Sequence, residues 1–183
     1  SILAKVRAKG AGSVEQWCTP TLPFGMRDNQ ATKVEPAQGD VPVVHGTRVG
    51  YLPLADIPRN TGWISRYKVL LPKASSGDTA QDSDGNIVDV VLGEPIALAP
   101  GSACTLTYLI AGMFDTAAEA ENYAHYLATK LVRFLVLQRK STQDVRPEVF
   151  RFVPQLDMTR RWTDEDLYEH FGLDTEERAE IEA

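Results

Sequence analysis

The sequence has 183 residues, 43% of them hydrophobic and 24% charged, which is the length and composition of a soluble protein with one continuous core. No apolar run approaches the roughly 20 residues of a membrane span, and the two cysteines and three histidines lack the spacing of a zinc site. The net charge of −6 arises from residues 162–183, which hold nine acids and one base, so the other 161 residues sum to +2. That excludes the strong positive charge of an independent DNA-binding module. We expect a reduced, cytoplasmic protein, although a disulfide between Cys18 and Cys104 stays open.

Residues 1–62 are rich in glycine and proline, and the short apolar pieces between these turn formers are candidate strands. These pieces are residues 4–8, 41–44 and 49–54. Any helix in this region is expected to be short.

Residues 63–114 have a strand-rich pattern, with candidate strands at residues 67–71, 87–92, 96–99 and 104–111. Residues 93–95 are short enough to form a hairpin or a bend in one strand. The acidic segment 77–86 contains an Asp-x-Asp-Gly fragment but lacks the remaining ligands of a calcium loop, so we expect a surface loop there.

A long helix is predicted over about residues 116–140. Thr116 and Glu119 form a capping-box pattern at its start. Apolar residues then recur at spacings of three and four, which predicts a buried stripe lying on the sheet. The stripe consists of Ala120, Ala124, Leu127, Leu131, Phe134 and Leu135.

The C-terminal part is expected to anchor residues 148–153 on the core and to end in a small acidic helical tail. Thr163 caps a helix over residues 164–171, Gly172 ends it, and Asp174 with Glu177 begins another. We expect this tail to be truncated from a longer chain. The whole pattern predicts an α+β domain over residues 1–161, strand-rich in residues 1–114, with a mixed or mostly antiparallel sheet packed against one long helix, followed by the tail 162–183.

The motifs of several enzyme classes are missing from the sequence. A metal-dependent nuclease needs a Pro-Asp pair with a downstream Asp/Glu-x-Lys, and an adenine methyltransferase needs a Gly-rich cofactor loop and a tetrapeptide that grips the flipped base. Neither set occurs, nor does a nucleophile elbow or a phosphate-binding loop. We therefore expect no catalytic residue and no metal site, and we interpret His45, His125 and His170 as surface or capping side chains.

The end of the predicted strand 67–71 is the first candidate binding site. After Pro72 the chain continues as Lys73-Ala74-Ser75-Ser76-Gly77, with Arg66 and Lys68 beside the strand. Hydroxyls, free N–H groups and an ammonium together suit a phosphate backbone. An ordinary strand followed by a polar turn explains the same residues.

A second candidate site is the basic second half of the long helix, followed by a Ser-Thr-Gln loop at residues 141–143. The helix dipole alone favours cations at this end, so a structural and a phosphate-binding explanation both stay open. A third place where the backbone could approach a ligand is the Pro-Gly-Ser-Ala turn that contains Ser102. The cations of the second site are Lys130, Arg133, Arg139 and Lys140.

Several short stretches, each weak alone, follow one another in a recognisable order. They are Trp63-Ile64, residues 67–77, residues 100–104, Thr107-Tyr108, residues 119–122, Thr129-Lys130, residues 133–135, residues 140–143, Phe150-x-Phe152-Val153-Pro154, residues 162–164, Leu167-Tyr168 and residues 171–173. Spanning about residues 48–181, they resemble the C-terminal target-recognition region of bifunctional type II restriction-modification enzymes. Those enzymes join a nuclease, an adenine-specific DNA methyltransferase and a recognition domain in one chain.

The resemblance implies a DNA sequence-recognition domain without catalysis or cofactor of its own. The parent enzyme would be a restriction endonuclease and adenine methyltransferase that uses S-adenosylmethionine and magnesium, and its other domains and double-stranded DNA would be the partners. The cations and serines above would position the DNA backbone, and Gln143 and Asn86 would read bases, because a carboxamide pairs both ways with adenine.

Two other hypotheses stay open. The chain could be a structural domain that bridges catalytic parts of the parent without reading bases, which the acidic tail favours. A standalone metal-dependent nuclease is the third, and the missing ligand motifs disfavour it.

Overall fold

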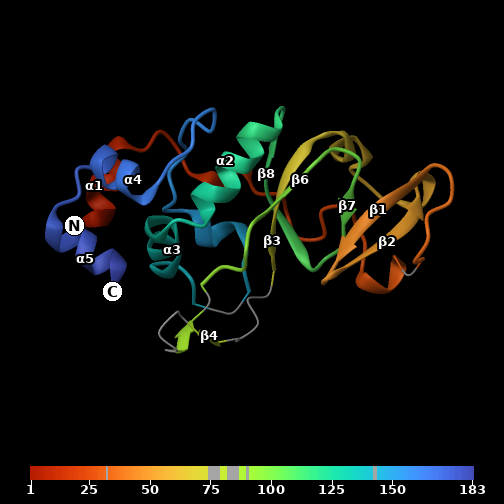
Figure 1. Ribbon diagram of the computed structural model, residues 1–183, viewed down its shortest axis with the longest axis horizontal. Helices are drawn as coiled ribbons and strands as arrows, with labels where there is room; N and C mark the ends of the chain where they lie inside the picture. Colours follow the sequence, from red (N-terminus) through yellow and green to blue (C-terminus); the bar gives the residue numbers. More distant parts are fainter. Residues whose placement is uncertain (32, 74–78, 82–86, 90, 142–143) are drawn as a thin grey trace.

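The computed structural model describes residues 1–31, 33–73, 79–81, 87–89, 91–141 and 144–183 (Figure 1). An antiparallel three-stranded sheet has the order β6-β3-β8, and its strands are Ile96–Leu98, Tyr67–Pro72 and Tyr108–Phe114. A second sheet has the order β2-β1-β7, antiparallel and then parallel, and its strands are Arg48–Pro53, Asp40–His45 and Ala103–Cys104. Two further strands, β4 (Thr79–Gln81) and β5 (Ile87–Asp89), pair antiparallel with each other.

Helices make up most of the remaining regular structure within the described residues. The α-helices are α1 (Ile2–Lys9), α2 (Ala117–Leu127), α3 (Lys130–Leu137), α4 (Asp164–Phe171) and α5 (Thr175–Glu182). Short 3₁₀ helices are formed by Val14–Trp17, Asp28–Gln30, Leu54–Asp56, Thr61–Ser65 and Pro147–Phe150. This is the predicted α+β class with mostly antiparallel pairing.

The β6-β3-β8 sheet is the middle layer of the molecule. Val69 and Leu71 of β3 are buried in a core shared with α2 and α3, whereas Leu70 is buried in a second core shared with β1 and β7. Figure 1 shows the helices on one side of β3 and the β2-β1-β7 sheet on the other. Because both faces of β3 are covered, its sequence is a nearly continuous apolar run.

The predicted long helix is in fact two helices, α2 and α3, with Thr129 in an extended conformation (ψ 153°) between them. The Thr129 hydroxyl donates to the Tyr126 carbonyl at 2.7 Å and accepts from the Val132 N–H at 3.4 Å. Asp164 completes the new N-terminus, because its carboxylate accepts the Lys130 and Leu131 N–H groups, both at 3.1 Å. The predicted apolar stripe still faces the core, but along two axes.

The Asp164 cap gives a stability prediction. Replacing Asp164 with Ala removes two hydrogen bonds and a favourable charge from the start of α3, so we expect a loss of about 1–2 kcal/mol in the free energy of unfolding. Asp164→Asn keeps an acceptor oxygen and should lose about half as much. Urea titrations of both variants would measure this difference, and an Ala variant as stable as the parent would contradict the capping role.

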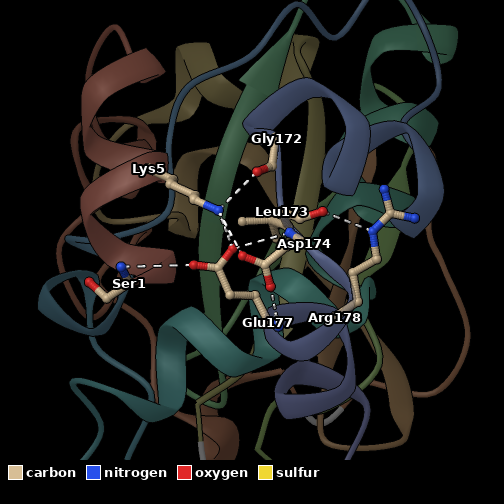
Figure 2. Close-up of polar contacts among 7 residues, drawn as sticks. All are labelled: Ser1, Lys5, Gly172, Leu173, Asp174, Glu177 and Arg178. Atoms are coloured by element: carbon tan, nitrogen blue, oxygen red, sulfur yellow. Dashed lines mark hydrogen bonds and ion pairs between the residues drawn. The ribbon is translucent and has the colours of Figure 1, made fainter.

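Residues 2–9 form helix α1 and not the strand predicted for residues 4–8. Ile2 and Val6 are both buried, a spacing of four that places them on one helical face. Lys5 then reaches across to the junction of α4 and α5, where its Nζ donates to the Gly172 carbonyl at 3.0 Å and to Glu177 Oε2 at 2.5 Å (Figure 2). These contacts fix α1 against the C-terminal helices.

The helices of segment 162–183 begin and end as predicted. Thr163 and Asp166 form a capping box at the start of α4, and Gly172 ends α4 in a left-handed conformation (φ 65°). Leu167, Phe171 and Ile181 are buried in the same core as α2 and α3. The acidic segment is therefore packed into the helical layer, with six of its nine acids exposed.

Of the predicted strands, some are confirmed and one is divided. Strands β1, β2, β3 and β6 are confirmed, whereas the strand predicted for residues 104–111 is split between β7 and β8. Residues 93–95 do not close a hairpin, because β5 pairs with β4 and β6 pairs with β3. Cys18 and Cys104 are free thiols. None of the helices in the described part of the chain is long and apolar enough to cross a membrane.

Candidate nucleic-acid interface

Two hollows lie where β3 ends and the chain leaves α3. The first has a volume of about 420 Å³, the second has a volume of about 680 Å³, and the two share Arg146 and Glu148. The first is lined by Arg139, Ser141, Asp144, Arg146, Glu148 and Val149. The second is lined by Glu15, Cys18, Pro20, Thr21, Lys73, Arg146, Pro147 and Glu148.

Backbone hydrogen bonds join the segments around these hollows. The Val145 N–H donates to the Lys73 carbonyl at 2.7 Å, and the Lys73 N–H donates to the Thr107 carbonyl at 2.8 Å. The 3₁₀ helix Pro147–Phe150 is anchored by Val149 and Phe150, both buried in the first core. The predicted anchoring role of residues 148–153 is confirmed, and it holds the neighbouring charged residues on rigid backbone.

The hollows carry charges of both signs. Lys73 and Arg139 make no ion pair with any residue that the structure describes, whereas Arg146 Nη2 lies 3.6 Å from Asp144 Oδ2. Among the acids, Glu15 binds Arg151 with oxygen–nitrogen distances of 3.2 and 3.3 Å. The linked hollows are therefore lined by three cations, Lys73, Arg139 and Arg146, which we call the rim cations, together with the acids Glu15, Asp144 and Glu148.

Lys73 and Arg139 are the predicted site residues that the fold brings to these hollows. They are 66 positions apart in the sequence, and the link runs through Arg146, which lines both hollows. Sequence reasoning missed Arg146. Its position directly before Pro147, at the start of the predicted anchoring segment, is the signal that could have found it.

Arg66 and Ser102 lie elsewhere. Arg66 precedes β3, so the six-residue strand separates it from Lys73 by roughly 20 Å. Its Nη2 is 3.2 Å from Asp115 Oδ1. Ser102 is half-buried in the turn before β7, where the neighbouring Gly101 N–H donates to the Ile64 carbonyl at 2.7 Å. Neither residue lines the hollows that Lys73 and Arg139 line.

Lys68 does not fit the predicted role in backbone binding, because its side chain is fully buried. Its Nζ donates to the carbonyls of Trp63 at 2.9 Å, Ile64 at 3.2 Å and Arg66 at 2.8 Å. All three ammonium hydrogens are used internally. Burial also lowers the pKa of Lys68 to about 8.

The basic residues of the former long helix fall into two groups. Lys130, at the start of α3, pairs with Glu182 Oε2 of α5 at 3.1 Å. Arg139 follows the C-terminal end of α3, more than about 12 Å from Lys130 along the helix axis. Arg133 is exposed on α3. Lys140 is half-buried and donates to the Val91 carbonyl at 2.7 Å, and burial lowers its pKa.

Four predicted residues lie outside the described part of the chain, namely Ser75, Ser76, Asn86 and Gln143.

Two histidines, His125 and His170, contact neighbouring side chains. His125 Nδ1 lies 3.1 Å from Arg161 Nη2, and the His170 ring packs edge-on against Trp162 and Phe171. Among the described residues, no three His, Cys, Asp or Glu side chains are grouped so that they could hold a metal ion.

Comparison with known proteins gives no match: no protein-family model, no curated protein and no solved structure is similar to this chain.

Proposed function

We propose that this chain is the DNA sequence-recognition domain of a type II restriction-modification enzyme. It would position duplex DNA for adenine methylation and cleavage performed by other domains of a cytoplasmic parent, with S-adenosylmethionine and magnesium bound there. The observation that carries this proposal is the rim of Lys73, Arg139 and Arg146, which come from three separate segments and border linked hollows.

The physical argument rests on where the unpaired cations lie. A side chain already held by a carboxylate must give up that bond to neutralise a phosphate, so Lys130 and Arg66, with contacts of 3.1 and 3.2 Å, are poorer candidates than Lys73 and Arg139. Arg146 is intermediate, because its contact with Asp144 is longer, at 3.6 Å. Arg133 is exposed but lines neither hollow. Lys68 is excluded by burial. The proposed binding surface is therefore centred on the end of β3 and the chain that follows α3, away from the acidic outer face of α4 and α5.

The first test is binding of the chain to duplex DNA as salt is varied. Each phosphate contact releases about one counterion, so the logarithm of the affinity should fall linearly with the logarithm of the salt concentration. With three rim cations we expect a slope of about −3 and weak binding at physiological salt. Fluorescence anisotropy with a labelled 20-base-pair duplex measures both quantities. Binding that does not respond to salt would contradict the proposal.

A structural bridge between catalytic parts of the parent is the second candidate function. It is favoured by the exposed acids of α4 and α5, which repel DNA and complement a basic protein surface; they include Glu165, Glu169, Glu176 and Glu180. Exchange of this domain between two parents with different recognition sites separates the candidates. If the recognised sequence stays with the catalytic portion, the bridging role is the correct one.

A further inference from the structure

Glu148 differs from the other acids that line the hollows. Asp144 pairs with Arg146, and Glu15 pairs with Arg151. Glu148 is exposed and lines both hollows, yet its carboxylate makes no hydrogen bond or ion pair within the described residues. Glu148 therefore shares these hollows with all three rim cations and has no hydrogen-bonded or ion-paired partner among the described residues.

The backbone of Glu148 is held firmly. It lies in the 3₁₀ helix Pro147–Phe150, whose first residue has a proline-fixed φ. The Val149 N–H donates to the Arg146 carbonyl at 3.1 Å, and the Arg151 N–H donates to the Glu148 carbonyl at 3.3 Å. The next two side chains, Val149 and Phe150, are buried. The carboxylate is thus carried on a rigid support, as a group that reads bases requires.

A carboxylate on a DNA-binding surface has a specific chemical use. It repels phosphates, so it weakens binding to every sequence, but it accepts a hydrogen bond from an exocyclic amino group on a base edge. In the major groove cytosine presents such a donor at N4, and Glu or Asp is the side chain that pairs with it. Rim cations together with an acid on a firmly held backbone match a division between backbone positioning and base readout.

We propose that Glu148 is a specificity-determining residue that accepts a hydrogen bond from the N4 amino group of a cytosine in the major groove. This inference rests on the proposed DNA-recognition function. It assigns to one side chain the discrimination that the rim cations cannot supply, because phosphates are the same in every sequence.

The test compares the chain with Glu148→Gln. Duplexes are selected from a randomised library with the unaltered chain, and affinities are then measured for the selected duplex and for versions with each base pair replaced. For the unaltered chain we expect one C·G pair whose replacement weakens binding about tenfold. In Glu148→Gln that preference should disappear or shift to adenine, since a carboxamide pairs with adenine N6 and N7.

The matched control is Glu35→Gln, which removes the same charge from an exposed acid that lines neither hollow. It should leave the base preference unchanged, and thermal unfolding should confirm that both variants fold. If Glu148→Gln tightens binding to all duplexes equally, Glu148 acts only by repulsion and the inference is wrong while the proposed function stands. If the unaltered chain binds no duplex in a salt-dependent way, the proposed function fails and the inference falls with it.

Discussion

The double variant Lys73→Glu/Arg139→Glu is expected to bind duplex DNA about a hundredfold more weakly than the unaltered chain at low salt. Each substitution removes one phosphate contact and places a negative charge beside the DNA backbone. The slope of log affinity against log salt should fall in magnitude by about two, because two fewer counterions are released. Anisotropy titrations at several salt concentrations measure both changes.

The matched control for this variant is Arg48→Glu. Arg48 is exposed on β2, in the sheet on the far side of β3 from the helices, and it lines neither hollow. It makes the same charge change per residue, so it reports the effect of net charge alone. Equal losses per substitution in the two variants would mean that DNA does not bind at the hollows.

The variant Lys68→Met is expected to change how stability depends on pH. Burial lowers the pKa of Lys68 to about 8, against roughly 10.4 in an unfolded chain. Between these values the unfolded state holds a proton that the folded state has released, so rising pH favours the folded state. The unaltered chain should therefore gain up to about 3 kcal/mol relative to Lys68→Met between pH 8 and pH 10.5.

The comparison isolates Lys68 when both proteins also carry Cys104→Ala, because Lys68 and Cys104 shift each other's pKa. Burial raises the pKa of Cys18 to about 12, so this thiol lowers stability to the same extent in both chains as pH rises above about 9. Urea unfolding at pH 7, 8.5 and 10 gives the difference in unfolding free energy. A difference that stays constant with pH would show that the carbonyls of Trp63, Ile64 and Arg66 hold the ammonium charged throughout.

Local sequence patterns determined the elements whose partners are close in the chain. The short apolar pieces at residues 41–44 and 49–54, which stand between turn formers, predicted β1 and β2, and these two strands pair directly through a tight turn. Thr163 and Gly172 marked both ends of α4, because caps act through hydrogen bonds within one turn. The apolar residues around Phe150 predicted an anchored segment, and three of them, Val149, Phe150 and Val153, are buried.

Contacts between distant segments decided the features that local patterns did not predict. Asp164, 34 positions away, caps α3 at Lys130 where the sequence predicted a continuous helix. Lys68 lies in a strand whose two faces are both covered, so a cation that we expected to bind the DNA backbone is buried and donates to three carbonyls. Arg146 and Lys73 line the same hollow because the Val145 N–H donates to the Lys73 carbonyl. Periodicity and capping act over a few residues and can be read from the sequence, whereas burial of a charge depends on which layers cover it, and that is set only when the chain folds.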